Sequence, residues 1–391
     1  MLLYQSPAET LTYDQLLISI NNAVVAHENY YADSYVDFIT NNVIALLHGV
    51  DISLVDYRNH KKPQETISDK IEPLEISSIS DLVERLQQST SKVNILSSGT
   101  TGTPKLIGQT IARLLKSVRI SEEYTHSRWA FTYNPAHSAG FQVFLQAIAN
   151  QATLYDLYKC PRVEIIDTII KNQITHLSAT PTFYRMLAPY DFEFSSIKSV
   201  TFNGEKSSKE LIDSITKVCP LARIRNIYGS TESGPLMSSD NTIFKVSDRM
   251  YGKVKIENGE LLIHSDLISK SIKDTEWYHT GDMVKVVAEQ PLTIEFLTRK
   301  TKIINVGGQN VNPQEVEEHL INHPNVQDTK VYGRKNRMIG NLIVAEVQTF
   351  PQTQISEKEL ITYCKSHLVA YKVPRMIKFV DKIEVGRTGK K

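Results

Sequence analysis

The chain has 391 residues, which is enough for two or three domains of ~150 residues each. Hydrophobic residues make up 41% and charged residues 22%, so we expect a sizeable core beneath an ordinary polar surface. The formal net charge of +1 gives no electrostatic case for nucleic acid or for an anionic membrane as a partner.

Cysteine usage and hydropathy narrow the class further. Cys160, Cys219 and Cys364 lie far apart and form no Cys-x-x-Cys pair, which argues against a disulfide framework and a structural zinc site. The first residues contain no basic segment followed by an apolar run, and no apolar run approaches the ~20 residues that span a bilayer. We therefore expect a cytoplasmic protein without a membrane span.

Residues 96–105 (LSSGTTGTPK) form the first informative stretch. The backbone N–H groups at Gly99 and Gly102 can approach phosphate oxygens closely. A Walker loop is excluded, because only two residues separate these glycines and Pro104 precedes the lysine. The side chains that can add donors or positive charge are Ser97, Ser98, Thr100, Thr101 and Lys105. The stretch predicts a phosphate-binding loop; a surface loop without a ligand is the alternative.

Strand and helix signals then alternate. Residues 163–173 and 209–219 have helical spacing, whereas residues 175–180, 196–204 and 223–229 have the pattern of strands. This alternation predicts a parallel α/β sheet, in which ligand sites lie beyond the carboxyl ends of the strands. Ser207 or Ser208 can cap the second helix, with Glu210 near the capping-box position. The polar segments FNGEK and NIYGSTESG both follow predicted strands.

The last third has a different pattern. Asn258-Gly259 predicts a hairpin turn within residues 252–265. A helix should begin after Asn312, with Pro313 in its first turn and Glu315 at the capping-box position.

The apolar face of this helix would comprise Val316, Leu320 and Ile321. A second helix over residues 356–368 repeats the capping pattern with Ser356 and Glu359, and strands are expected at 329–333 and 342–348. We therefore expect a small α+β domain from about Thr301 onward.

Five stretches occur in a fixed order: residues 97–105, 226–234, 277–282 (WYHTGD), 298–317 (TRKTKIINVGGQNVNPQEVE) and 386–391 (GRTGKK). Together they resemble the adenylate-forming superfamily of acyl-CoA synthetases, nonribosomal-peptide adenylation domains and luciferases, over nearly the whole chain. The resemblance implies an α/β protein with a large N-terminal ATP- and acyl-binding domain (1–300) and a small mobile C-terminal lid (301–391). It also implies ATP, Mg²⁺ and coenzyme A as cofactors.

The resemblance assigns roles within the motif YGSTE. Tyr228 would stack on adenine, Gly229 would lie beside the nucleotide, and Thr231 would contact phosphate. Glu232 would hold Mg²⁺, which usually binds one or two carboxylates together with substrate phosphates.

Further roles follow from the other stretches. Asp282 and Arg299 would bind the ribose, and Lys390 would be the adenylation lysine, which neutralises charge where the substrate carboxylate meets the α-phosphate. The residues expected to lie along the adenine are Asn203, Gly204 and Glu205.

The second half-reaction is assigned to the loop NVGGQN. Gly307 and Gly308 would leave room for a phosphopantetheine arm, although the same pair also suits a strand-to-helix turn. Thr301 would act as the hinge, at a position where the family usually has Asp or Lys. Domain rotation would bring Lys390 and Gly308 to the site in turn.

Residues 134–144 (NPAHSAGFQVF) bear on the substrate. His137 and Gly140 fall where acyl-CoA synthetases contact the acyl group, although His137 also suits an ordinary core position. No acidic residue occurs from 128 to 152, which disfavours an amino acid, and the apolar neighbours favour a fatty or aryl acid.

The leading hypothesis is an AMP-forming acid:CoA ligase. One alternative is an adenylating enzyme that loads a separate carrier protein. Another is a relative that binds ligand without catalysis, which Thr301 and the short ends of the chain motivate. A second copy of the chain is a further partner that the sequence leaves open.

Overall fold

The computed structural model describes residues 1–28, 30, 32, 34–54, 68–97, 105–269 and 275–384. Six predicted site residues lie outside this part of the chain: Ser98, Gly99, Thr100, Thr101, Gly102 and Lys390. For Ser97 and Lys105 only the backbone is described.

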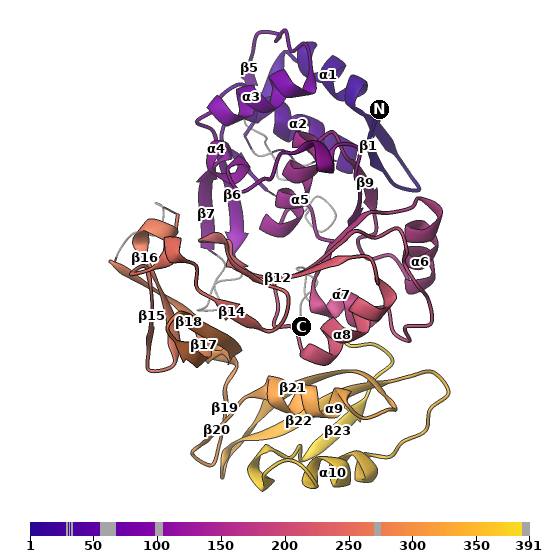
Figure 1. Cartoon of the computed structure of the whole chain (residues 1–391), viewed down its shortest axis with the longest axis vertical. Helices are drawn as coiled ribbons and strands as arrows, with labels where there is room; N and C mark the ends of the chain where they lie inside the picture. The colour runs from indigo at the N-terminus through magenta and orange to yellow at the C-terminus, as the bar shows by residue number, and fades with distance from the viewer. Residues whose placement is uncertain are drawn as a thin grey trace.

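A mixed sheet of eight strands forms the centre of the N-terminal region (Figure 1). In spatial order its strands are β13 (Gly234–Ser239), β12 (Arg223–Ser230), β11 (Ser199–Asn203), β10 (His176–Ala179), β8 (Arg128–Phe131), β9 (Thr153–Asp156), β1 (Leu2–Gln5) and β2 (Thr10–Thr12). The six strands from β12 to β1 run parallel, and β13 and β2 are antiparallel to their neighbours. The predicted parallel α/β sheet is confirmed.

Short helices connect these strands and cover the sheet: α5 (Ser138–Ala149), α6 (Arg162–Lys171), α7 (Pro181–Met186) and α8 (Lys209–Val218). Helix α8 buries Leu211 and Ile215 against the sheet. Its N-cap is Ser208, whose hydroxyl accepts from the Leu211 N–H. The predicted capping-box role of Glu210 is therefore wrong, because Leu211 occupies the third helical position.

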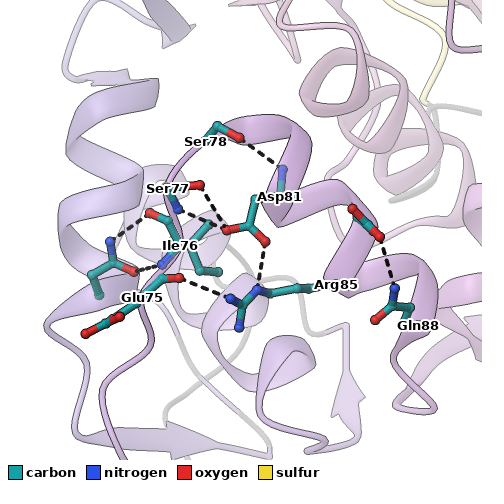
Figure 2. A network of polar contacts seen from close by, with 9 residues as sticks. Glu75, Ile76, Ser77, Ser78, Asp81, Arg85 and Gln88 are labelled. Atoms are coloured by element: carbon teal, nitrogen blue, oxygen red, sulfur yellow. Dashed lines mark hydrogen bonds and ion pairs between the residues drawn. The ribbon is translucent and has the colours of Figure 1, made fainter.

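The N-terminal layer contains α1 (Tyr13–Asn21), α2 (Tyr35–Leu47), α3 (Ile79–Gln88) and α4 (Ile111–Leu115), with β3 (Val25–His27) paired to β5 (Ser68–Lys70). Figure 2 shows how α3 begins: Ser78 caps it, and Asp81 accepts from the Ser77 N–H (3.0 Å) and from Arg85 Nε (2.9 Å). The Ser77 N–H and then Arg85 lower the pKa of Asp81. The network fixes the segment that enters α3.

Two further sheets carry other predicted motifs. A three-stranded sheet comprises β4 (Ile52–Ser53), β6 (Lys92–Ser97) and β7 (Lys105–Thr110). An antiparallel five-stranded sheet comprises β14 (Ile243–Lys245), β18 (Leu292–Arg299), β17 (Trp277–Glu289), β16 (Glu260–His264) and β15 (Val254–Glu257). The predicted hairpin is confirmed, with φ of 51° at Asn258 and 77° at Gly259.

A separate C-terminal domain follows a 3₁₀ turn at Lys300–Lys302. Its sheet contains β20 (Gln309–Val311), β19 (Ile304–Val306), β22 (Gly340–Thr349), β21 (Val326–Asn336) and β23 (Met376–Phe379). Helices α9 (Pro313–Ile321) and α10 (Glu357–Lys365) pack on this sheet around an apolar cluster of their own. The exact domain limits at 300 and 301 stay a prediction.

The capping predictions for these two helices have different outcomes. Ser356 and Glu359 form the predicted capping box of α10. Asn312 caps α9 as predicted, but Glu315 binds Lys372 Nζ (2.6 and 2.7 Å) instead of returning to the N-cap. Ile321 is only half-buried, so the apolar face of α9 is narrower than predicted.

The C-terminal domain packs against the end of the α7 and α8 region (Figure 1). Lys206 Nζ, just before α8, lies 2.8 Å from Glu318 Oε1 on α9. Gln327 Nε2 on β21 donates to the Ala188 carbonyl (3.4 Å), which follows α7. Within the described ranges, no helix combines the length and the apolar character that crossing a bilayer requires.

Candidate active site

Ser97 and Lys105 of the predicted phosphate-binding stretch pair directly across β6 and β7, and residues 98–104 between them lie outside the described part of the chain. Strand β7 is held close to the loop after β12. Gln109, which is buried, donates from Nε2 to the Thr231 carbonyl at 2.5 Å. Ser269 links the same two segments: its hydroxyl donates to Gly108 O (2.8 Å) and its N–H to Glu232 O (2.8 Å). Strand β7 and the turn after β12 thus lie side by side, although Gln109 and Thr231 are 122 positions apart in the sequence.

The carboxyl end of β12 makes a sharp, closely packed turn. A Cβ at Gly229 would lie 2.5 Å from the Gly234 carbonyl oxygen, so only glycine fits beside β13. Ser230 and Ser233 are joined by their hydroxyls (3.1 Å) across the turn. This turn presents Thr231 and Glu232 at the end of a parallel strand, where ligand sites of α/β sheets lie.

Asp282 lies between the two large sheets. It is 7% exposed, and its carboxylate accepts from the Tyr228 hydroxyl on β12 (2.8 Å) and pairs with Arg299 Nε on β18 (2.8 Å). An ionised carboxylate accepts several hydrogen bonds at once, and hydroxyl groups such as those of a ribose are donors that suit it. The structure brings together three predicted ligands that are separated by up to 71 positions in the sequence, 228 to 299.

Tyr228 is fixed on one side. Its ring stacks on Phe296, with centroids 4.0 Å apart and planes inclined by 22°. Burial and then the Asp282 charge raise the pKa of Tyr228 well above its usual value, so the phenol is a neutral donor. One face of the ring is therefore occupied by protein, and adenine stacking could use only the other.

Glu205 has a local partner that the sequence did not indicate. Its Oε2 accepts from the Thr182 hydroxyl (2.7 Å) and N–H (3.0 Å) in the first turn of α7. Asn203 ends β11, and Gly204 follows it with φ of 89°, which turns the chain toward α7. This segment lies next to β12 in the sheet, as a position along the nucleotide requires.

Glu232 remains the predicted Mg²⁺ ligand. The described residues contain no group of three or more His, Cys, Asp or Glu side chains that could hold a metal by themselves. One carboxylate beside substrate phosphates fits Mg²⁺, which keeps several waters and seldom uses an all-protein cage.

His137 and Gly140 lie at the start of α5. Ser138, which follows His137, has its hydroxyl 3.5 Å from that of Thr231, so the start of α5 adjoins the turn after β12. A Cβ at Gly140 would lie 2.2 Å from the Asn134 carbonyl oxygen, which gives this glycine a packing role. Acyl contact by His137 or Gly140 stays a prediction.

Gly307 and Gly308 form the two-residue turn of the β19–β20 hairpin, with φ of 57° and 83°. The alternative of a strand-to-helix turn is thus corrected, since β20 precedes α9. A Cβ at Gly308 would meet no atom within 4 Å. Thr301 lies in the 3₁₀ turn between β18 and β19, where a hinge would be needed.

Five residues at the site escaped sequence reasoning: Gln109, Ser138, Thr182, Ser269 and Phe296. Ser138 follows a predicted site residue directly and could have been included. Gln109 and Thr182 act through contacts with distant segments, and a single sequence carries no signal for them.

Family models match most of the chain. The AMP-binding enzyme model matches residues 39–266, and the AMP-binding enzyme C-terminal domain model matches residues 315–390. The 4-coumarate–CoA ligase CCL1 of Humulus lupulus is 26% identical over 340 residues, which cover 75% of this chain and 62% of the relative. The 2-succinylbenzoate–CoA ligase of Bacillus licheniformis is 25% identical, with 77% of this chain and 68% of the relative covered. The chain thus spans about two thirds of the length of these relatives.

Solved structures share the fold. O-succinylbenzoate CoA synthetase from Bacillus subtilis, in complex with its acyl-adenylate intermediate, has a TM-score of 0.72 at 18% identity, with 100% of this chain and 93% of that chain covered. Amide bond synthetase McbA from Marinactinospora thermotolerans has a TM-score of 0.70 at 14% identity, with coverages of 100% and 95%. With the first family model matching more than half of its residues, this chain belongs to the AMP-binding enzyme family.

Proposed function

We propose that the chain is an AMP-forming acid:CoA ligase that activates a fatty or aryl carboxylic acid. The observation that carries the proposal is the Tyr228–Asp282–Arg299 network beside the Thr231 turn and the β6–β7 hairpin. In this proposal Asp282 accepts from the ribose hydroxyls, and the nearby Thr231 hydroxyl donates to a phosphate. The CoA ligases among the relatives support this reaction class.

The reaction has two steps. A carboxylate oxygen of the acid attacks the α-phosphorus of ATP, and pyrophosphate leaves with the electron pair of the broken P–O bond. The thiol sulfur of CoA then attacks the acyl carbon, loses its proton, and displaces AMP. The first step replaces an oxide leaving group by a phosphate-stabilised one, which makes the second step feasible.

Each site residue has a defined task in this proposal. Asp282 orients the ribose, and Arg299 balances the buried carboxylate. The Thr231 hydroxyl and the backbone of the β6–β7 loop hold phosphates, and Lys390 offsets the negative charge that builds up during the attack. Mg²⁺, held by Glu232 and the phosphates, would supply charge neutralisation of the departing pyrophosphate.

The test is a panel of fatty, aryl and amino acids, assayed by pyrophosphate release with and without CoA. We expect release with an apolar acid, and stoichiometric acyl-CoA when CoA is present. If none of the acids supports pyrophosphate release or acid-dependent ATP–pyrophosphate exchange, the chain binds ligand without catalysis and the proposal is wrong.

A further inference from the structure

Three hydrogen bonds form a closed ring between segments that are distant in the sequence. Gln109 Nε2 on β7 donates to the Thr231 carbonyl (2.5 Å), and the Ser269 N–H donates to the Glu232 carbonyl (2.8 Å). The Ser269 hydroxyl closes the ring, because it donates to the carbonyl of Gly108 (2.8 Å), which precedes Gln109 on the same strand. We call these three bonds the anchoring ring.

The anchoring ring holds the backbone of the two predicted ligand residues after β12. Thr231 and Glu232 are consecutive, and each has its carbonyl bonded to a different distant segment. Bonds inside the turn, such as that between the hydroxyls of Ser230 and Ser233, set only the shape of the turn. The anchoring ring sets its position relative to β7, so that the two ligand side chains project from a fixed backbone.

Ser269 is itself held in place by the helix that follows β7. Arg113 on α4 donates from Nη1 to the Ile268 carbonyl (3.1 Å) and from Nη2 to the Leu267 carbonyl (3.3 Å). The planar guanidinium directs both bonds from one rigid group. Ser269 is buried, at 3% exposure, and so is Ile268. The segment that ends at Ser269 is therefore fixed to β7 and α4 at three successive residues.

Gln109 is a polar side chain in a position that packing alone would give to an apolar one. It is only 5% exposed, and a buried amide is costly unless it is hydrogen-bonded. Its bond to the Thr231 carbonyl satisfies the amide and ties the turn to β7. The same strand begins at Lys105, a predicted phosphate ligand that pairs with Ser97 on β6. The anchoring ring thus joins the strand of one predicted phosphate ligand to the backbone of two others.

We propose that Gln109 and Ser269 are positioning residues for adenylation, which act by fixing Thr231 and Glu232 relative to β7. The proposal rests on the proposed function and concerns its first step. When the acid attacks the α-phosphorus, the groups that hold the triphosphate must already be in place, because small displacements of such groups slow a reaction strongly. Thioester formation starts from the adenylate and releases no pyrophosphate, so it depends less on this turn.

Gln109→Met tests the proposal, because it keeps an unbranched side chain of similar size and removes the donor. We expect kcat/KM for ATP in ATP–pyrophosphate exchange to fall roughly five- to tenfold, the effect of about one hydrogen bond. Titration calorimetry with ATP and Mg²⁺, without acid, should show a weaker Kd. Conversion of a supplied acyl-adenylate to acyl-CoA should stay near the wild-type rate. The matched control is Gln146→Met, which removes the bond from Gln146 Nε2 to the Arg119 carbonyl (2.7 Å) in the last turns of α5 and should change none of the three.

Ser269→Ala opens the anchoring ring at a different bond, the one to the Gly108 carbonyl. If the ring acts as one unit, Gln109→Met/Ser269→Ala should lose less exchange activity than the product of the two single losses.

Three results would overturn the proposal: unchanged exchange in both single variants, equal losses in exchange and in acyl-adenylate conversion, or a double variant that loses the full product. If the wild type binds ATP but shows no exchange with any acid, the proposed function fails by itself. The ATP affinities of Gln109→Met and Gln146→Met then still decide whether Gln109 positions the turn.

Discussion

At the scale of single residues, Asp282 has the most constrained surroundings. Its carboxylate is buried between β12 and β18, where desolvation would be costly if Arg299 and Tyr228 did not both contact it. Tyr228 in turn is held by its stack on Phe296, so its hydroxyl has one available direction. The position of the predicted ribose ligand therefore depends on an aromatic pair that does not touch the ribose.

Tyr228→Phe tests this dependence. It keeps the ring stack but removes the donor to Asp282, and a hydrogen bond to a charged group contributes roughly 1.5–3 kcal/mol. We expect the free energy of unfolding to fall by about 2 kcal/mol in urea titrations, and KM for ATP to rise several-fold. Tyr251→Phe, at a site that is 90% exposed, is the control and should change neither. Unchanged values for Tyr228→Phe would show that the bond has no net effect.

The surroundings of His176 predict that the stability of the fold depends on pH, independently of catalysis. The side chain is buried on β10 and stacks on Trp129 (4.5 Å, 20°). Burial, and then Lys198 and Arg225, lower its pKa to about 4. The unfolded chain, with a His pKa of about 6.5, therefore binds the proton more readily than the folded chain. The stability that comes from keeping His176 neutral is complete above pH 6.5 and is lost as the pH falls toward 4.

Between pH 7.5 and pH 5.0 we expect the free energy of unfolding to fall by about 2 kcal/mol. Urea unfolding at the two pH values should show this loss of stability in the wild type. His176→Phe retains an aromatic ring against Trp129 and should make the free energy of unfolding less dependent on pH. His126→Asn, an exposed position with φ of 60° that Asn tolerates, should keep the wild-type dependence. An equally steep loss in His176→Phe would place the titrating group elsewhere.

At the scale of elements, local signals located most helices and turns but not their partners. Asn258-Gly259 specifies its hairpin because both residues accept positive φ, and Asn312-Pro313 specifies the start of α9. Glu315 failed as a capping residue because Lys372, distant in sequence, offers its carboxylate a stronger ionic partner. Such competition depends on tertiary structure and is invisible in a single sequence.

At the candidate site, too, the sequence located the motifs but not all of the contacts between them. The motifs on β12, β17 and β18 were predicted, and their association is seen in the Tyr228–Asp282–Arg299 contacts. The contact between Gln109 and Thr231 was not predictable, because it requires knowing that a separate small sheet packs beside β12.

Helix α5 offers a test of how an element positions the site. In Gly140→Ala the new Cβ would lie 2.2 Å from the backbone oxygen of Asn134, so the helix start must shift, and overpacking of this kind costs typically 1–3 kcal/mol. We expect a loss of stability in that range and weaker ATP–pyrophosphate exchange, since Ser138 adjoins Thr231. In Gly108→Ala the Cβ meets two side chains, Asn94 Oδ1 at 2.8 Å and Lys92 Cδ at 3.9 Å, and side chains can move, so a smaller loss is expected. Equal losses in both variants would contradict this explanation.

At the scale of the whole molecule, the C-terminal domain has its own sheet and core, and in the described part of the chain it contacts the N-terminal region through polar groups that include the Lys206–Glu318 pair and the Gln327–Ala188 hydrogen bond. Such an interface suits a domain that changes orientation, because its contacts can be exchanged at low cost. The proposed division of labour requires that exchange: Lys390 serves adenylation, and Gly308 serves thioester formation.

Two variants separate the half-reactions. Gly308→Trp fills the open space at the β19–β20 turn and should abolish thioester formation while ATP–pyrophosphate exchange continues. Gly308→Asn, which tolerates the φ of 83°, controls for backbone strain and should keep both activities. Lys390→Ala should abolish ATP–pyrophosphate exchange but should still convert a supplied acyl-adenylate to the thioester. If each variant impairs both steps equally, the two residues do not alternate.

The Lys206–Glu318 pair tests whether orientation governs the balance between the steps. At 2.8 Å, with side-chain exposures of 18% and 38%, it stabilises only the domain orientation in which the two residues meet. A partly exposed pair contributes about 0.5–1 kcal/mol, so Lys206→Gln and Glu318→Gln should each change the ratio of adenylation to thioester rate roughly two- to fivefold, in the same direction. The swapped variant Lys206→Glu/Glu318→Lys should return the ratio toward the wild type. Lys209→Gln breaks a more exposed pair with Asp213 inside α8 and should leave the ratio unchanged, because that pair survives any domain rotation. If the swapped variant instead deviates by the sum of the two single changes, the contact is incidental, and other contacts must set the domain orientation.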